Sequence, residues 1–320
     1  MNTDQSFALD SAYTCDRTHI TKSYLKFFGQ EHCMSTLTFV GTGAIGLPMA
    51  QRLSEAGHSV TGVDPFEAAR VRGRDAGLSM VETYTESPPN DVVVVMVATP
   101  AQLDDLVTEA TLETNRNKIA SSLWIIMSTV GPDSVHQAAV KLAELGARVV
   151  DAPVTGGVSG AVAGKLTVFA SGAITDVEQA QILLANLGNI RNVGSLVGNG
   201  QSVKVVNQHL ASVHLVAAAE ALALAKHLGL NPEEVFELIR HGAAGSWMLN
   251  DRGPRMLKGE GADVLSTIGI FVKDSGLVAS AAENVGATTP LLNAARERFN
   301  LAESRGQAKE DDSSVIKTFL

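Results

Sequence analysis

The first half of the chain alternates short apolar runs with segments of helical periodicity, beginning abruptly at Leu37. Residues 91–97 are almost continuously apolar, as expected for a strand buried on both faces of a parallel sheet. The other predicted strands span residues 37–41, 59–64, 123–127, 147–151 and 165–171. Helical stretches separate them, and Pro132 stands where the first position of a helix tolerates proline. The alternation predicts an α/β fold with a Rossmann-type doubly wound sheet over residues 36–198.

From about Gln201 onward the strand signals largely vanish. A long alanine-rich helix is predicted over residues 201–228, and Asn231 followed by Pro232 is a typical helix start. Pro290 begins the last predicted helix. We therefore expect a second, all-α domain over residues 199–320, joined to the first by the long helix.

Residues 1–35 lack this patterning. They have no apolar core of a secretory signal and are acidic for a mitochondrial presequence, so we expect a poorly packed extension. The two cysteines, Cys15 and Cys33, both lie there, which predicts neither a disulfide framework nor a cysteine-rich zinc site and fits a reducing cytosol.

Composition narrows the functional classes. A chain of 320 residues with 45% hydrophobic and 18% charged residues is typical of a soluble globular protein. The net charge of −9 argues against nucleic acid, whose phosphates demand a basic surface. No apolar run approaches the ~20 residues of a membrane span, so no membrane partner is expected.

The turn after the first strand carries the pattern G-x-G-x-x-G over Gly41, Gly43 and Gly46, with Ala44 and Ile45 between the last two glycines. The first glycine permits a tight turn, the second lets a pyrophosphate approach the backbone, and the third lets helix and strand pack closely. The following helix presents free N–H groups to phosphates. This context predicts a dinucleotide site; the alternative is a glycine-rich turn without a ligand.

The next strand ends at Asp64, where the dinucleotide fingerprint has an acidic residue. A carboxylate there accepts hydrogen bonds from the adenosine ribose and repels the 2′-phosphate of NADP. Pro65 and Phe66 follow instead of an arginine, which favours NAD. Arg70 and Arg72 lie close by and keep NADP open, although such arginines are more often solvated.

Other polar and glycine-rich positions follow predicted strands, at the sheet edge where open α/β sheets bind ligands. Ser128 and Thr129 are candidates to touch the cofactor, or else turn formers. Thr155, Gly156 and Gly157 belong to a glycine-rich stretch whose backbone N–H groups suit an anion such as a carboxylate; the alternative is a flexible loop.

The start of the long helix carries Lys204, Asn207, Gln208 and Ala211 at spacings that place them on one face. A poorly solvated lysine has a depressed pKa and suits proton transfer, whereas most lysines are solvated. No tyrosine is followed by a lysine four residues later, so the short-chain dehydrogenase pattern is absent. Helical histidines are more often packed than catalytic. Lys204 is therefore the favoured acid/base.

Several motifs, spread over most of the chain from Leu37 onward, match those of one known protein family. They are the glycine-rich turn, the strand-end Ser128-Thr129, the segment 151–161 (DAPVTGGVSGA), the Gly-x-x-x-Lys204 pattern, and later GSW, PRM and FVKD. In these features the chain resembles the β-hydroxyacid dehydrogenase family, which includes 3-hydroxyisobutyrate dehydrogenases and tartronate semialdehyde reductases. The resemblance implies NAD(P)-dependent oxidation of a small hydroxy acid by a homodimer or homotetramer.

Residue by residue, the resemblance assigns roles to several positions. It makes Lys204 the catalytic lysine, places the substrate carboxylate on Thr155, Gly156 and Gly157, and sets Thr129 and Lys273 beside the cofactor. The family usually has asparagine four residues after the lysine, where this chain has Gln208, with Asn207 just before it. That departure is similar to the L-threonate dehydrogenase branch, which oxidises a four-carbon sugar acid. A semialdehyde reductase and a non-catalytic cofactor-binding module remain the alternatives.

Overall fold

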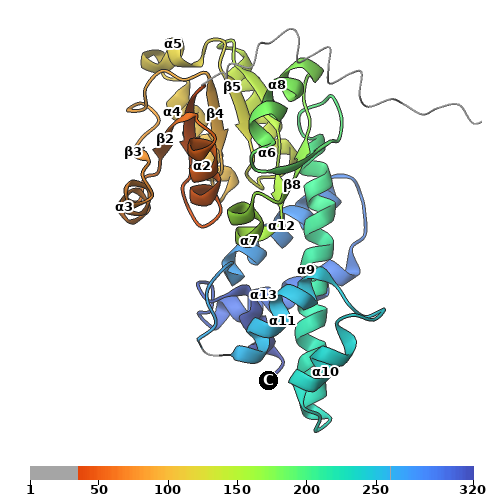
Figure 1. Cartoon of the computed structure of the whole chain (residues 1–320). Helices are drawn as coiled ribbons and strands as arrows, with labels where there is room; N and C mark the ends of the chain where they lie inside the picture. The colour runs from red at the N-terminus through yellow and green to blue at the C-terminus, as the bar shows by residue number, and fades with distance from the viewer. Residues whose placement is uncertain (1–34, 260) are drawn as a thin grey trace, which may run out of the picture. The chain divides into compact units, whose positions relative to one another are not determined.

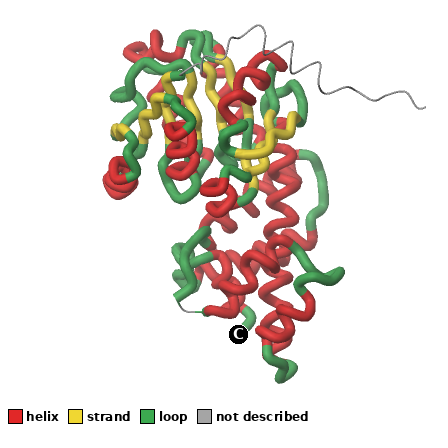
Figure 2. The backbone as a smooth tube through the Cα atoms, in the orientation of Figure 1, coloured by secondary structure: helices red, strands yellow, loops and turns green. Residues whose placement is uncertain are grey.

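The computed structural model describes residues 35–259 and 261–320, and residues 35–320 form one compact unit. The expectation for residues 1–35 and for the two cysteines therefore falls outside the described residues, apart from Ser35. Within the compact unit, the N-terminal part of the chain is built around a sheet, and the C-terminal part consists of helices (Figure 1; Figure 2).

Six parallel strands form the first sheet in the order β3-β2-β1-β4-β5-β6, which is the doubly wound arrangement. The strands are β1 (Thr36–Val40), β2 (Ser59–Val63), β3 (Ser79–Val81), β4 (Val92–Val95), β5 (Leu123–Ile126) and β6 (Arg148–Asp151). The segments joining them are α2 (Gly46–Glu55), α3 (Glu67–Asp75), α4 (Pro100–Ala110), η1 (Glu113–Asn115), α5 (Arg116–Ile119) and α6 (Pro132–Ala143). The predicted Rossmann-type sheet is confirmed.

The apolar run of β4 faces two cores. Val92 and Val94 belong to one buried cluster, with Phe39, and Val93 and Val95 to the other, with Trp124. Because successive side chains of a strand point to opposite faces, a strand covered by helices on both sides needs apolar residues at every position.

A smaller three-stranded sheet follows the first. In it β7 (Val154–Thr155) pairs antiparallel with β8 (Leu166–Ala170), and β8 pairs parallel with β9 (Gly188–Asn192). The helices α7 (Gly157–Ala163) and α8 (Ile174–Leu184) lie between these strands in sequence. The glycine-rich stretch expected as a loop therefore folds partly as a short helix.

The rest of the described chain is helical, as predicted: α9 (Asn199–His227), α10 (Pro232–Ile239), α11 (Trp247–Lys258), α12 (Ile268–Asn284), α13 (Pro290–Ser304) and the 3-10 segment η2 (Asp312–Thr318). Its core brings Leu215, Ala219 and Leu222 of α9 together with Phe271 and Phe299. The two phenylalanine rings lie 5.2 Å apart between centroids. The long helix α9 is thus the central element of this half.

The 29-residue helix α9 contains a window of 18 residues with a mean hydropathy of 1.2, so by length and composition alone it could cross a membrane. The sequence prediction concerned uninterrupted apolar runs, and α9 is interrupted by polar residues such as Lys204, Asn207 and Gln208. Half of the apolar window is buried inside the fold, where α9 packs against α11, α12 and α13. The helix is apolar because it fills the core of a helical domain.

Candidate active site

The first turn of α9 is fixed by a buried carboxylate at the end of β6. One oxygen of Asp151, Oδ2, accepts hydrogen bonds from the backbone N–H groups of Gly198 (3.0 Å) and Gln201 (2.9 Å). The hydroxyl of Ser171 lies 3.3 Å from the same oxygen. Burial raises the pKa of Asp151, and these hydrogen bonds oppose the shift. The carboxylate therefore aligns the start of α9 with the sheet.

Gln201 completes this junction. Its side-chain oxygen accepts hydrogen bonds from the backbone N–H groups of Val130 and Gly131, each at 3.0 Å. Its Nε2 donates to the carbonyl of Ser128 and to Asp151 Oδ1, each at 2.9 Å. All four side-chain contacts are made in a fully buried position. Gln201, which sequence reasoning missed, thus ties the loop after β5 to the turn that carries Lys204.

Lys204 lies one turn further along α9, with 6% of its surface exposed. Its Nζ donates to the side-chain oxygen of Gln208 at 2.8 Å. Burial lowers the pKa of Lys204 to about 8, with the negative charge of Asp274 acting against the shift and the positive charge of Lys273 adding to it. A lysine with this pKa exchanges a proton readily near neutral pH.

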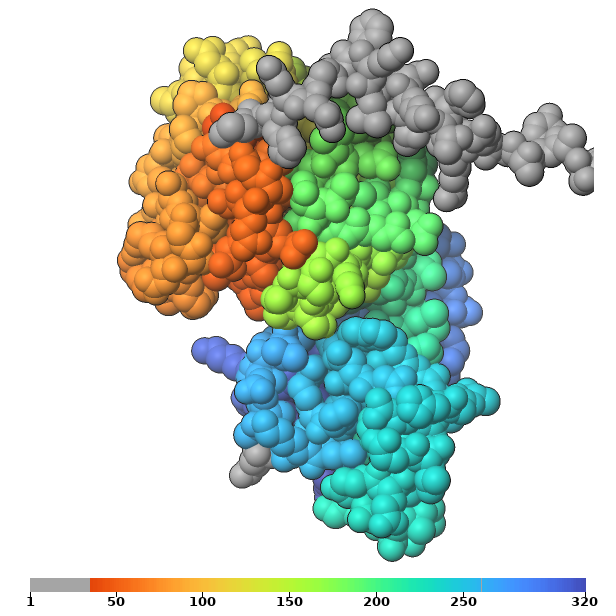
Figure 3. Space-filling view, in the orientation of Figure 1, coloured from red at the N-terminus to blue at the C-terminus, as the bar shows by residue number. Residues whose placement is uncertain are grey.

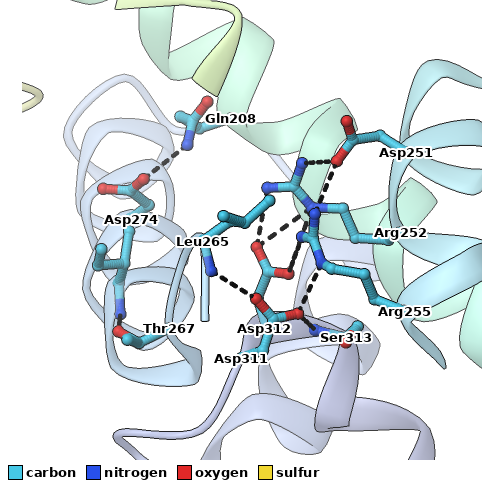
Figure 4. A network of polar contacts seen from close by, with 11 residues as sticks. Gln208, Asp251, Arg252, Arg255, Leu265, Thr267, Asp274, Asp311, Asp312 and Ser313 are labelled. Carbon is cyan, nitrogen blue, oxygen red and sulfur yellow. Dashed lines mark hydrogen bonds and ion pairs between the residues drawn. The ribbon is translucent and has the colours of Figure 1, made fainter. Parts of the chain in front are cut away.

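Gln208 links Lys204 to a buried carboxylate. Its Oε1 accepts hydrogen bonds from Lys204 and from Asn207 Nδ2 (2.9 Å), and its Nε2 donates to Asp274 Oδ2 at 2.6 Å (Figure 4). Asp274, on α12, is 4% exposed. Because the amide nitrogen is held by Asp274, the amide oxygen faces the lysine. As predicted, Lys204, Asn207 and Gln208 share one face of α9, where their side chains are linked by hydrogen bonds. Asp274 of α12 also contacts this face, which the sequence does not predict.

Lys273 bridges α12 to the strand end. Its Nζ donates to the carbonyl of Thr129 at 2.9 Å and pairs with Asp274 Oδ1 at 2.8 Å. Thr129 is partly exposed, whereas Ser128 is fully buried with its hydroxyl 3.4 Å from the carbonyl of Val95. Of the two strand-end residues, Thr129 is therefore the one with exposed surface.

The predicted carboxylate loop lies where β7 passes into α7. Gly156 and Gly157 have φ angles of 129° and 65°, a region that side chains other than glycine rarely adopt. A Cβ at Gly157 would meet no atom within 4 Å, so the backbone there borders open space. Thr155 is partly exposed beside it.

The glycine loop meets the requirements of a pyrophosphate cradle. Gly41 has a φ of 91°, and a Cβ there would collide with the carbonyl of Met96. A Cβ at Gly46 would collide with the carbonyl of Gly41, while Gly43 faces open space. Ile45 precedes the first residue of α2. The residues thus allow a tight turn, an open approach and close helix packing, in the order that dinucleotide binding needs.

A pocket of about 360 Å³ opens beside this loop, within the size range of ligand sites. Its lining combines the glycine loop, α2, α3, α7 and the segment before α12: Gly43, Ala44, Leu47, Pro48, Arg72, Val158, Val264 and Leu265. Figure 3 shows the yellow-green α7 segment between the orange-red α2 region and the light-blue residues of the helical half.

Asp64 is buried at the end of β2. Its Oδ2 accepts from the backbone N–H of Thr42 at 2.9 Å, and its Oδ1 accepts from that of Phe66 at 3.0 Å. Arg70 forms ion pairs with Glu67 (2.7 Å) and Glu82 (3.0 Å). Its guanidinium is therefore already neutralised by carboxylates, while Arg72 lines the pocket.

Comparison with known proteins agrees with this architecture. Residues 36–207 match the NAD binding domain of 6-phosphogluconate dehydrogenase, and residues 198–319 match the family described as NAD-binding of NADP-dependent 3-hydroxyisobutyrate dehydrogenase. Fold and site thus define an NAD(P)-dependent dehydrogenase with a helical second domain. The chain belongs to the 3-hydroxyisobutyrate dehydrogenase family and is a hydroxyacid dehydrogenase.

Three relatives illustrate the relationship. An L-threonate dehydrogenase of Cupriavidus necator is 37% identical over 88% of this chain and 94% of its own length. An L-threonate dehydrogenase of Escherichia coli is 34% identical over 88% of this chain and 93% of its own. A crystal structure of 3-hydroxyisobutyrate dehydrogenase from Salmonella typhimurium superposes with a TM-score of 0.81 at 32% identity, covering 88% of this chain and 99% of the other.

Proposed function

We propose that this protein oxidises a four-carbon hydroxy acid of the L-threonate type with NAD, and that Lys204 is the general acid/base. The observation that carries the proposal is the burial of Lys204 beside Gln208, with a pKa of about 8. Relatives at 37% and 34% identity are named L-threonate dehydrogenases.

In the oxidation direction, neutral Lys204 accepts the proton of the substrate hydroxyl. A bound nicotinamide cofactor would supply the acceptor for the hydride from the carbon that carries this hydroxyl. In reduction, the ammonium of Lys204 returns the proton to the forming alcohol oxygen. A pKa of about 8 keeps both forms of Lys204 accessible, which a reversible reaction needs.

Gln208 and Asn207 orient the reacting groups. Asp274 holds the Gln208 amide with its oxygen toward Lys204, so the ammonium or amine has a fixed direction. The amide of Asn207 donates to the same oxygen and adds a second polar group at the site. The substrate carboxylate lies on Thr155, Gly156 and Gly157, where the backbone borders open space at Gly157.

NAD is favoured over NADP at this site. The residues Gly41, Gly43, Ala44, Ile45 and Gly46 would hold the pyrophosphate, and Asp64 would hold the adenosine ribose, where its negative charge would disfavour a 2′-phosphate. Arg70 is already paired with two carboxylates and therefore offers little positive charge to such a phosphate. Thr129 and Lys273 would border the nicotinamide end of the cofactor.

The proposal is tested by initial rates with NAD and with NADP on a panel of hydroxy acids: L-threonate, D-threonate, L-serine, 3-hydroxyisobutyrate and glycerate. The highest kcat/KM is expected for L-threonate with NAD. A preference for 3-hydroxyisobutyrate would favour the activity named for the Salmonella typhimurium structure instead. Fast reduction of tartronate semialdehyde with little aldonate oxidation would point to a semialdehyde reductase. The absence of any hydride transfer would leave a non-catalytic dinucleotide-binding module.

Replacing Asp274 with asparagine is expected to shift the pH dependence of oxidation to lower pH. The negative charge of Asp274 raises the pKa of Lys204, so its loss lowers that pKa further, and neutral Lys204 forms at lower pH. The measurement is kcat/KM for the hydroxy acid against pH. An unchanged ascending limb would show that Asp274 does not act on the titrating group.

We further propose that the protein works in the cytoplasm. We also propose that it forms a homo-oligomer in which one face of α9 is buried. Val206, Leu210, Leu224 and Leu228 are large apolar residues, each at least half exposed, at helical spacings along that face. Leu224→Glu is expected to shift the protein to monomer in light scattering. Leu238→Glu, at an exposed position on α10, is the matched control and should leave the mass unchanged. A native mass equal to one chain would contradict the oligomer.

A further inference from the structure

The pocket beside the glycine loop has a wall from the helical domain. Val264 and Leu265 line it together with Gly43 and Ala44. These two apolar side chains are 55% and 42% exposed, so each has surface that a bound ligand would cover. They belong to residues 264–267, which we call the strap. The strap precedes α12, the helix that carries Lys273 and Asp274.

The backbone of the strap is bound to the C-terminal segment on its other side. Leu265 N–H donates to Asp311 Oδ2 at 3.0 Å, and the carbonyl of Ser266 accepts from Asp312 N–H at 2.9 Å. Thr267 and Asp311 form an antiparallel bridge. These contacts hold the strap by its main chain and leave the side chains of Val264 and Leu265 turned toward the pocket.

Asp311 and Asp312 are themselves held by two arginines of α11 (Figure 4). Arg252 Nη2 lies 2.9 Å from Asp312 Oδ2, and Arg255 Nε lies 2.9 Å from Asp311 Oδ1. Asp251 contacts both guanidinium groups. Asp311 and Asp312 are buried, so these ion pairs are shielded from solvent and hold in place the two carboxylate residues to which the strap is bound.

From this arrangement we infer that the strap is the retaining wall of the dinucleotide site, with Val264 and Leu265 closing on the bound cofactor and Asp311 as the positioning residue. The inference rests on the proposed placement of the cofactor at the glycine loop. Binding buries the exposed surface of the two side chains and excludes water from the pyrophosphate region. Arg72 of α3, which also lines the pocket, supplies a positive charge near the phosphates.

The test measures NADH binding directly by its fluorescence, with dissociation rates from stopped flow, and needs no turnover. Val264→Ala with Leu265→Ala is expected to raise the NADH dissociation rate about tenfold, because apolar contact with the cofactor is lost. Both side chains are largely solvated, so the fold should survive. Val285→Ala, at a 78% exposed apolar position away from the pocket, is the matched control and should bind as the wild type does.

Asp311→Asn tests whether the position of the strap matters, because this variant weakens the hold on the strap backbone but keeps the side chains of Val264 and Leu265. NADH dissociation should again be faster, with the substrate KM at saturating NAD unchanged. Unaltered NADH dissociation in both strap variants would overturn the inference. Gly43→Asp, which puts a negative side chain at the predicted pyrophosphate position, should abolish NADH binding. If Gly43→Asp abolishes NADH binding and the strap variants bind NADH normally, only the strap inference fails. If Gly43→Asp still binds NADH, the placement of the cofactor at the glycine loop fails, and the strap inference fails with it.

Discussion

Replacing Lys204 with alanine is expected to lower kcat in both directions by about 10³-fold or more, while NADH still binds. A general acid/base contributes about 10²–10⁴-fold to a rate, and the substitution also leaves the Gln208 oxygen with only the amide of Asn207 as a donor. The glycine loop lies on another element, so cofactor affinity should stay within about twofold. The measurements are steady-state rates with L-threonate and an NADH fluorescence titration.

Two further variants sharpen this prediction. Lys226→Ala removes an exposed lysine from the last turn of the same helix and should leave kcat unchanged. Lys204→Arg keeps the positive charge but not the titration, because a guanidinium does not lose its proton in this pH range. It should therefore be as inactive in oxidation as the alanine variant. Turnover near the wild-type rate in Lys204→Ala would remove Lys204 from the reaction.

Replacing Asp151 with alanine is expected to lower the free energy of unfolding by about 3 kcal/mol or more. The change leaves the N–H groups of Gly198 and Gln201 and the Gln201 amide without their buried acceptor. It also frees the first turn of α9, so the residual activity of the folded protein should fall with stability. The measurement is urea unfolding followed by circular dichroism.

The matched control for this prediction is Asp105→Ala, which removes an exposed carboxylate from α4 and should change stability by less than about 0.5 kcal/mol. Asp151→Asn keeps the shape and one acceptor oxygen, and should fall between the wild type and Asp151→Ala. Equal stability of Asp151→Ala and the wild type would show that α9 does not depend on the carboxylate.

Much of the fold could be predicted because its pattern is local. The buried run of β4 carries apolar residues at every position, and α9 carries a long stretch with no strand or turn signal. Strand β9, with the sequence GNIRN, was not predicted, because most of its residues are polar or exposed and the strand forms by pairing with β8. Local sequence does not show pairing with a partner strand.

The site also combines contacts within one segment, which local sequence predicts, with contacts between distant segments, which it does not. The spacing of Lys204, Asn207 and Gln208 lies within one helix, so their hydrogen bonds follow from the sequence. Asp274 is 66 residues away from Gln208, and Asp151 is 50 residues away from Gln201; only the packing of α12 and β6 against α9 brings each pair together. The strap is likewise held by Asp311, which is 46 residues away from Leu265 in the sequence.

The most direct test of Lys204 as acid/base is the pH dependence of kcat/KM for hydroxy-acid oxidation by the wild-type protein. Burial lowers the pKa of Lys204 to about 8, and only its neutral form accepts the hydroxyl proton. The rate constant should therefore rise tenfold per pH unit below about 8 and level off above it. In the reduction direction it should be constant at low pH and fall above about 8. A profile that stays flat between about pH 6 and 10 in both directions would contradict the account.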